Sequence, residues 1–471
     1  MGEPAPAARR PDATGTLGLA SATALVAGNI VGTGIFLLPA SLAGVGTAGI
    51  WALAAAWLGA VALALVFRRL NGRGPSPGGP YAYTRDAFGA FPAFLVAWSF
   101  WLTAWGVAAG IAMAWAGYVN YFLGWDGLLG RDGTAARIAI ALAGIWIAAL
   151  INVTGFRNAG RFQLVTAVLK CLPLLVVGVA GLIFLNVTGA SLGPFDATGG
   201  PGSTGGSDSG GSAWQAIWPA AGLVVLVFAG LESAAVAAGR ISRPVRDAGR
   251  AGLYGVLACG ALYLLVTIAL FGTVPHDALA ASSAPFAAAL SVLFGAGPWG
   301  AVIAGCAIVA GIGALNGWTM TAAEMARAAA RDGAFPEGFA RTSRRGASVT
   351  GIVAGAALTS LMLLAAGLSG NAFDAILLYV SFTMAVPYLF SVAAWGAQRS
   401  RAGNAGAEKI KKARLAGDAG VGMAALLFIS ALLYGSGLDA VAPGLLALAL
   451  GVPVFLRTRF RTRLRRDVFP A

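Results

Sequence analysis

Long apolar stretches repeated along the chain limit most strongly how this sequence can fold. Residues 17–44 contain no charged side chain, and further stretches of similar character follow. Each is near or above the ~20 residues that a helix needs to cross the hydrocarbon core of a bilayer. The sequence therefore predicts an all-α polytopic membrane protein with about twelve transmembrane helices. The windows are 16–44, 48–67, 91–122, 135–153, 162–186, 214–239, 250–272, 298–326, 349–368, 372–396, 417–436 and 439–456.

The distribution of charge sets the orientation of these helices. Of the 471 residues 11% are charged and 58% hydrophobic, with a mean hydropathy of +0.78. The net charge of +14 gathers in alternating loops, Arg240 and Arg327 among their charges, which marks those loops as cytoplasmic. Topology and contact with anionic lipid account for this charge, so we expect no nucleic-acid binding. We expect a multi-pass protein of the plasma or inner membrane with both termini cytoplasmic.

The same pattern divides the chain into one large domain between two tails. We expect a disordered cytoplasmic tail at 1–14, a transmembrane domain at 15–456 and a basic cytoplasmic tail at 457–471. Within the domain we expect a first repeat at about 15–186, a second at about 214–396 and two extra helices at about 417–456.

No residue pattern calls for catalysis, a metal or a cofactor. Cys171, Cys259 and Cys306 lie far apart within apolar windows. His276 has only Asp277 beside it. The chain has no nucleophile elbow, phosphate-binding loop or catalytic pair of carboxylates. We therefore predict neither an enzyme nor a metal or cofactor site.

The first apolar window is interrupted by Gly28, Gly32 and Gly34, and glycine is a poor helix former. Unpaired backbone groups are tolerated within a membrane only where they line a cavity or water. A break here would direct the free amides from Thr33 to Ile35 at an anion and the carbonyls around Ile30 at a cation. A site for an anion beside a site for a cation matches the carboxylate and the ammonium group of an amino acid. The alternative is that the glycines only allow a neighbouring helix to approach closely.

The sixth window is interrupted in the same way. Residues 227–233 place Gly230 and the carboxylate of Glu232 near the middle of an apolar stretch. Windows one and six are five apart, as two inverted repeats of five helices would require. Corresponding interruptions in the two halves of a membrane protein are the best sequence indication of a transport site.

Residues 28–39 (GNIVGTGIFLLP) resemble the first-span signature of the amino acid–polyamine–organocation superfamily. The resemblance is greatest to its basic amino acid/polyamine antiporter family, which includes bacterial arginine/agmatine antiporters. It extends through residues 230–239, 317–319 and 386–389. It implies the LeuT-type fold: a five-plus-five inverted repeat with helices 1 and 6 interrupted, followed by two C-terminal helices.

The resemblance also implies roles for particular residues. Thr33 and Gly34 would bind the substrate carboxylate, and carbonyls of the two breaks would bind its amino group. Trp318 would form an aromatic wall against the substrate side chain, with Glu232 as a proton-responsive carboxylate and Tyr388 as its gate partner. The substrate-binding positions implied are Ile30, Gly32, Thr33, Gly34, Leu226, Ala229 and Trp318.

Three positions depart from the arginine/agmatine antiporters. Leu226 stands where they have an aromatic residue, and Ala108 replaces an asparagine that helps to bind the guanidinium. Phe100 replaces a gating tyrosine. Fewer polar groups remain to select a cationic side chain, so both a cationic and a neutral substrate stay open.

Lys170 lies deep in the fifth window, about 14 Å along a helix from Arg161 at 1.5 Å per residue. Proton-coupled transporters of the superfamily resemble this chain in having a lysine there, in the place of a sodium ion. A mid-membrane lysine costs at least ~2.5 kcal/mol, which favours a coupling role. The alternative is a lysine that extends to the membrane surface.

These observations predict a secondary active amino acid transporter that works by alternating access. It would be an amino acid/amine antiporter or a proton-coupled carrier. The alternative is a non-transporting amino acid sensor with the same fold. The expected partners are a small amino acid or amine, protons if transport is coupled to them, and the lipid bilayer. A homodimer stays open.

Overall fold

The computed structural model describes residues 17–72, 74, 77–123, 134–190, 192, 224, 227–282, 284–368, 372–403, 411–436 and 440–468. Across these ranges all regular elements are helical, and the single β feature is an isolated parallel bridge between Leu17 and Ile241. The predicted all-α class is therefore confirmed. The predicted tail at 1–14 lies outside the described residues.

The first half of the chain forms helices up to residue 188. They are α1 (Leu19–Ile30), η1 (Thr33–Phe36), α2 (Leu38–Ala43), α3 (Ala48–Asn71), α4 (Pro80–Phe88), α5 (Ala90–Leu123), α6 (Thr134–Val153) and α7 (Phe156–Thr188).

The second half begins with the short helices of the sixth window. They are α9 (Ser233–Val236) and η2 (Ala237–Arg240), followed by α10 (Pro244–Thr273), α11 (His276–Ala280), α12 (Pro285–Phe294), α13 (Trp299–Arg331), η3 (Glu337–Ala340), α14 (Val349–Leu368) and α15 (Ala372–Gly403). The chain ends with α16 (Lys411–Ser436), α17 (Val441–Ala449) and α18 (Gly451–Val468).

Within the described ranges, 9 helical segments are long and apolar enough to cross a membrane. They comprise α3, α5, α6, α7, α10, α13, α15, α16 and a segment over Val441–Arg459. Shorter apolar helices coincide with α1, α12 and α14. The count of about twelve spans stays a prediction, because windows one and six are divided into short pieces.

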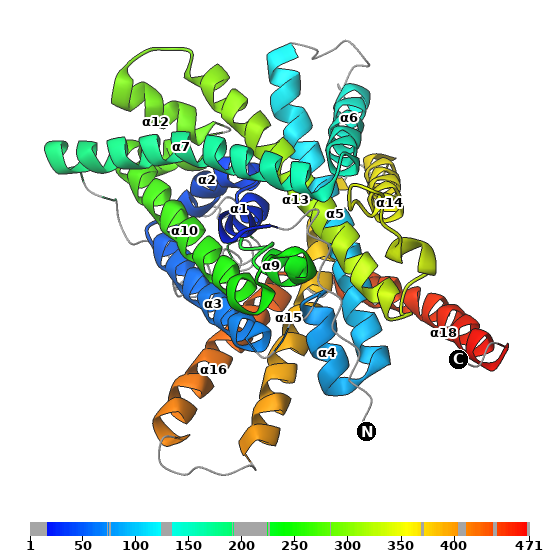
Figure 1. Ribbon diagram of the computed structural model, residues 1–471. Coiled ribbons are helices and arrows are strands. Elements are labelled where there is room, and N and C mark those ends of the chain that lie inside the picture. The colour runs from blue at the N-terminus through cyan, green and yellow to red at the C-terminus, as the bar shows by residue number, and fades with distance from the viewer. Residues whose placement is uncertain are drawn as a thin grey trace.

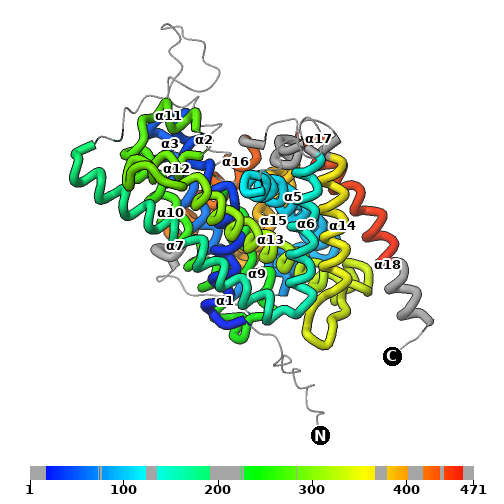
Figure 2. Tube along the Cα trace, turned by 90° about the horizontal axis from the view of Figure 1, so that it is seen from above, coloured from blue at the N-terminus to red at the C-terminus, as the bar shows by residue number. Residues whose placement is uncertain are grey.

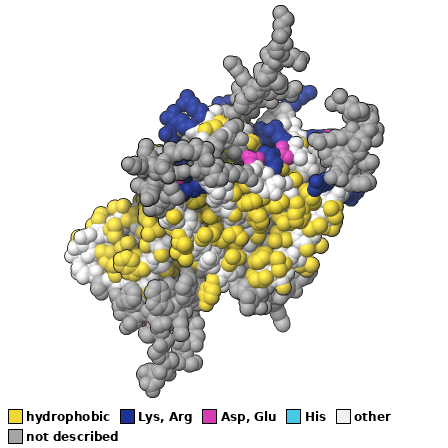
Figure 3. Space-filling model, turned by 90° about the horizontal axis from the view of Figure 1, so that it is seen from below, with side chains coloured by type: hydrophobic (Ala, Val, Ile, Leu, Met, Phe, Trp, Pro, Cys, Tyr) yellow, Lys and Arg dark blue, Asp and Glu magenta, His cyan; other side chains and the backbone are white. Residues whose placement is uncertain are grey.

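The broken helices lie at the centre of the molecule. Figure 1 shows α1 and α9 surrounded by α10 and α3 on one side and by α13 and α5 on the other. Figure 2 shows α2, α11 and α12 gathered at one end. In Figure 3 a broad band of hydrophobic side chains covers one face, with Lys and Arg along one border. That distribution is typical of a protein embedded in a bilayer.

The two interrupted windows run side by side in opposite directions. The amide of Leu17, where the first window begins, donates to the carbonyl of Arg240, where the sixth ends (2.7 Å). Midway along, Gly230 has φ +102°, and a Cβ on it would lie 2.6 Å from the Cβ of Asn29. Only glycine combines that backbone conformation with so close an approach. The predicted interruptions of helices 1 and 6 are confirmed.

Candidate functional site

A cavity of about 280 Å³ lies at the break in the first window. Six of the seven predicted substrate-binding residues line it: Ile30, Gly32, Thr33, Gly34, Ala229 and Trp318. The seventh, Leu226, lies outside the described residues. Its other lining residues include Ile111, Ala114 and Tyr118 of α5 and Tyr263 of α10. The fold therefore brings both broken helices, α5, α10 and α13 to one small space.

The second part of the first window begins inside this cavity. The chain is extended at Gly32 (φ −102°, ψ −154°), and η1 then opens with Thr33 and Gly34. The first amides of a helical turn have no acceptor within it, so they are available to a ligand. A Cβ on Gly34 would meet no atom within 4 Å. The space beside Gly34 is therefore part of the cavity and is not filled by a neighbouring helix.

The carbonyls at the end of α1 already have side-chain donors. The Nζ of Lys170, which is fully buried, donates to the carbonyl of Gly28 (2.7 Å) and also to that of Val31. The hydroxyl of Tyr263 donates to the carbonyl of Ile30 (2.9 Å). Lys170 and Tyr263 therefore hold the break open by binding the carbonyls that it frees. The sequence analysis did not foresee that the oxygen of Ile30 would be engaged by a tyrosine.

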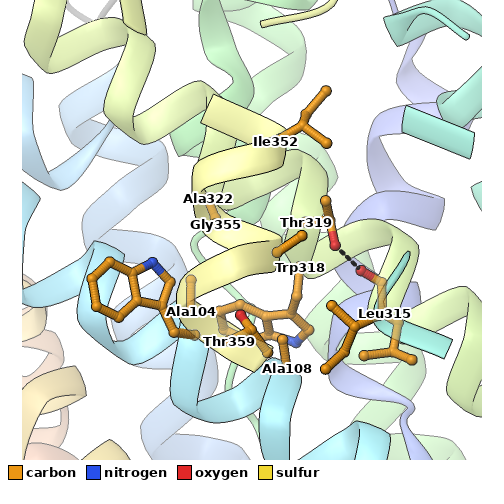
Figure 4. Close-up of a pocket in the computed structure, with 12 residues that line it drawn as sticks. Ala104, Ala108, Leu315, Trp318, Thr319, Ala322, Ile352, Gly355 and Thr359 are labelled. Atoms are coloured by element: carbon orange, nitrogen blue, oxygen red, sulfur yellow. Dashed lines mark hydrogen bonds between the residues drawn. The ribbon is translucent and has the colours of Figure 1, made fainter. Parts of the chain in front are cut away.

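Trp318 separates the cavity from a smaller pocket behind it. Its Nε1 donates to the carbonyl of Asn29 (3.3 Å), and its ring stacks on Phe100 with centroids 6.4 Å apart. Figure 4 shows Trp318 beside Ala104 and Ala108 in the smaller pocket. Phe100 does not line the larger cavity, but it packs against Trp318, which does. This arrangement fixes the indole as a wall.

Glu232 and Tyr388 form a buried pair outside the cavity lining. Both side chains are 1% exposed, and the hydroxyl of Tyr388 donates to the Oε2 of Glu232 (2.6 Å). Within the described part of the chain, the Oε1 of Glu232 is buried with no hydrogen-bond partner. The hydroxyl of Tyr388 is therefore the one side-chain donor to this carboxylate among the described residues.

A buried ion cluster lies at the end of the molecule where α1 begins. Glu324, six residues beyond Trp318 on α13 and so about 9 Å along the helix, accepts from the Nε of Arg327 (2.8 Å) and from the Nε of Arg240 (3.1 Å). Arg240 also donates to the carbonyl of Gly346 (2.6 Å). The cluster joins η2, α13 and the segment before α14, and so seals that end.

Sequence reasoning missed this cluster. It treated Arg240 and Arg327 only as loop charges that set topology. The available signal was Glu324, an acidic residue within an apolar window and three residues before an arginine, since side chains at that spacing are neighbours on a helix.

The cavity is open at its other end. Leu37, at the junction of η1 and α2, is 43% exposed, and the lining residue Ser41, about one helical turn further along, is also exposed. Thr33 and Trp318 are buried at its base. A site with free amides at its base, an aromatic wall, one open end and one sealed end can bind a small molecule and release it by a change of conformation.

A helical membrane protein with two broken spans around such a cavity has the architecture of a secondary transporter. The comparisons with known proteins agree: the chain belongs to the amino acid permease family, whose model matches residues 17–452. The prediction of a transporter is confirmed over that of a sensor.

Curated relatives are transporters as well. The chain is 31% identical over 356 residues to a putative arginine/ornithine antiporter of Bacillus subtilis, covering 70% of this chain and 73% of that one. It is 30% identical over 388 residues to the cadaverine/lysine antiporter of Escherichia coli K12, covering 80% and 82%. It is 30% identical over 460 residues to a putative arginine/ornithine antiporter of the same strain, covering 94% and 92%.

Among solved structures the chain is similar to Mhp1, a nucleobase-cation-symport-1 family transporter in a closed conformation with bromovinylhydantoin bound. The TM-score is 0.53 over 98% of this chain and 95% of that one, at 13% sequence identity. This likeness concerns the fold alone, and it confirms the predicted LeuT-type architecture.

Proposed function

We propose that this chain carries an amino acid across the cell membrane by alternating access, with both termini cytoplasmic. The observation that carries the proposal is the cavity at the break of the first window, where the amides of Thr33 and Gly34 are presented beside open space. A carboxylate is the ligand group that such amides bind best.

The substrate would lie across the break. Its carboxylate would accept from the amides of Thr33 and Gly34. Its amino group would donate to the carbonyl of Ala229 and to that of Ile30, whose oxygen also accepts from Tyr263. The substrate side chain would then extend towards Trp318. Each polar group of the zwitterion has a backbone partner, as burial in a membrane requires.

The asymmetry of the two ends supports an outward-facing state. The open end lies beside Leu37 and Ser41, on the side that the positive-inside rule assigns to the exterior. The sealed end carries the cluster of Arg240, Glu324 and Arg327. To release substrate into the cytoplasm, that cluster must separate while η1 and α2 close over the cavity.

Exchange is the mode that the relatives favour, since those described above are named as antiporters. A proton-coupled carrier is the second candidate, and a specific contact favours it. The Nζ of Lys170 binds the carbonyls of Gly28 and Val31, which end α1 just before the break. Gain or loss of a proton on this amine would therefore act directly on the geometry of the site.

The test is counterflow into proteoliposomes. Vesicles loaded with an unlabelled mixture of amino acids and amines should take up an external labelled member transiently and above equilibrium, and empty vesicles should not. Gly34→Leu, which fills the cavity, should abolish the effect. Failure of every amino acid and amine to give counterflow in a folded, correctly inserted protein would contradict the proposal.

A further inference from the structure

We infer that the substrate is an amino acid with an uncharged, apolar side chain and not a basic amino acid or a diamine. The inference rests on the proposed function and names the substrate class of the same cavity. It distinguishes this chain from the antiporters that it resembles in sequence.

The described residues that line the cavity carry no charged side chain. Its polar side chains are those of Asn29, Thr33, Ser41, Tyr118 and Tyr263, and the remainder of the lining is backbone or apolar. The helices that supply most of this lining contain no Asp, Glu, Lys or Arg anywhere between residues 17 and 67 or between 90 and 123. Residues 209–231, which include the first part of the sixth window, are likewise uncharged.

Two polar side chains near the base of the cavity, those of Asn29 and Tyr263, already donate to neighbouring groups. The amide nitrogen of Asn29 donates to Ser233 (2.6 Å) and Thr321 (3.0 Å). Its Oδ1 has no hydrogen-bond partner among the described residues, but it is buried against α13, where a Cβ on Gly317 would lie 1.9 Å from it. The hydroxyl of Tyr263 donates to Ile30. A cationic side chain at this depth would therefore find no carboxylate and few free acceptors.

A basic group, the amine of Lys170, lies beside the cavity and disfavours a second cation. Lys170 binds the carbonyls of Gly28 and Val31, which flank the lining residues Asn29 and Ile30. A positive charge on Lys170 would oppose a second cation in the same low-dielectric space. An added cation without a counter-charge would be costly to bury, so the site is better matched to a neutral side chain.

The smaller pocket beyond Trp318 also has a mainly apolar lining without charged side chains. The smaller pocket is lined by Ala104, Ala108, Leu315 and Ile352, with hydroxyls only at Thr319 and Thr359. The hydroxyl of Thr319 donates to the carbonyl of Leu315 (2.7 Å), as Figure 4 shows. A substrate side chain that passed the indole would still meet apolar groups. The face of Trp318 attracts cations, but it packs apolar side chains equally well and supplies no counter-charge.

The test is competition for counterflow. Proteoliposomes are assayed with labelled leucine, isoleucine, valine or phenylalanine, and separately with labelled arginine, lysine or cadaverine. We expect apolar amino acids to exchange with an apparent affinity at least about tenfold better than the basic compounds, equivalent to about 1.4 kcal/mol. Equal or better exchange of arginine, lysine or cadaverine would overturn the inference and leave the proposed function standing. If neither class exchanges but another amino acid gives counterflow, the inference alone is overturned; if no amino acid or amine gives counterflow, both fail.

A matched pair of variants tests whether the absence of a carboxylate from the described lining is what disfavours basic substrates. Ala114→Asp adds a carboxylate to the lining of the cavity, and Ala114→Asn adds the same shape without the charge. The Asp variant should gain arginine or lysine exchange about tenfold and the Asn variant should not. Ser41→Asp, at the exposed mouth of the cavity, is the second variant, chosen because its site does not need to repack. No gain in either Asp variant would contradict the electrostatic argument.

Discussion

Replacing Lys170 by methionine and by alanine should affect substrate exchange to different extents. The lysine is fully buried, and its Nζ donates to the carbonyls of Gly28 and Val31 at the end of α1, just before the break. Lys170→Met fills the same space with an apolar chain and leaves both carbonyls unpartnered. Lys170→Ala leaves a space with two acceptors, in which a water molecule can bind both oxygens.

The expected magnitudes follow from those contacts. An unpartnered buried carbonyl costs about 1–3 kcal/mol, so Lys170→Met should destabilise the broken conformation by about 2–6 kcal/mol. At about 1.4 kcal/mol per factor of ten, exchange in that variant should fall by between one and four orders of magnitude. Lys170→Ala should keep exchange within about tenfold of wild type, because a bridging water is nearly as good as a direct hydrogen bond.

Both variants should lose accumulation driven by a pH gradient, because neither can carry a proton at this site. The assay compares uptake into proteoliposomes under an imposed pH gradient with exchange at equal pH on both sides. Lys170→Arg, which keeps the donors and the charge, is the control for exchange. If Lys170→Ala accumulates substrate on the gradient as wild type does, the lysine is structural and pure exchange is the better account.

Three further substitutions test the site. Gly34→Leu should abolish substrate binding and Gly34→Ala should keep it, because a single Cβ there meets open space and a leucine fills the cavity. Equilibrium binding to the purified protein checks this, and normal affinity of the Leu variant would make Gly34 a packing residue. Trp318→Ala should weaken the apparent affinity for substrate about tenfold or more, an effect of about 1.4 kcal/mol. Trp318→Phe should weaken it less because an aromatic face remains, and unchanged transport by the Ala variant would place the substrate elsewhere. Glu232→Gln should flatten the pH dependence of uptake, since it cannot ionise but can still accept from Tyr388; an unaltered pH profile would remove Glu232 from the coupling mechanism.

The sequence predicts the broken helices because their cause is local. Glycines within an apolar window weaken a helix at a depth where free backbone groups need a cavity, and both interruptions are found in the structure. The open space beside Gly34 is also consistent with the sequence argument. The roles assigned to Thr33, Gly34 and Trp318 stay predictions until binding is measured.

The contacts that complete the site depend on packing between distant segments. Tyr263 reaches the carbonyl of Ile30 across 233 positions of sequence, and no local pattern marks that tyrosine among the other aromatic residues. The pairing of Glu324 with Arg240 depends in the same way on where η2 meets α13. The charge pattern places Arg240 in a loop, and only the fold shows its partly buried guanidinium paired with the carboxylate of Glu324.

Alternating access is tested most directly by the reactivity of single cysteines at the open mouth of the cavity and between the broken helices. The three native cysteines are free thiols, so they can be replaced before one cysteine is introduced at Ser41 or at Ser233. Ser41 lies exposed at the open mouth, and Ser233 is fully buried between the broken helices.

The measurement is the rate of labelling by a membrane-impermeant thiol reagent applied to each side of oriented proteoliposomes, with and without transported amino acid. Our account predicts a reciprocal change: substrate slows labelling of Ser41→Cys from the outside and speeds labelling of Ser233→Cys from the cytoplasmic side. If a substrate that shows counterflow changes the labelling rate at neither position, that result would contradict the alternating opening of this cavity.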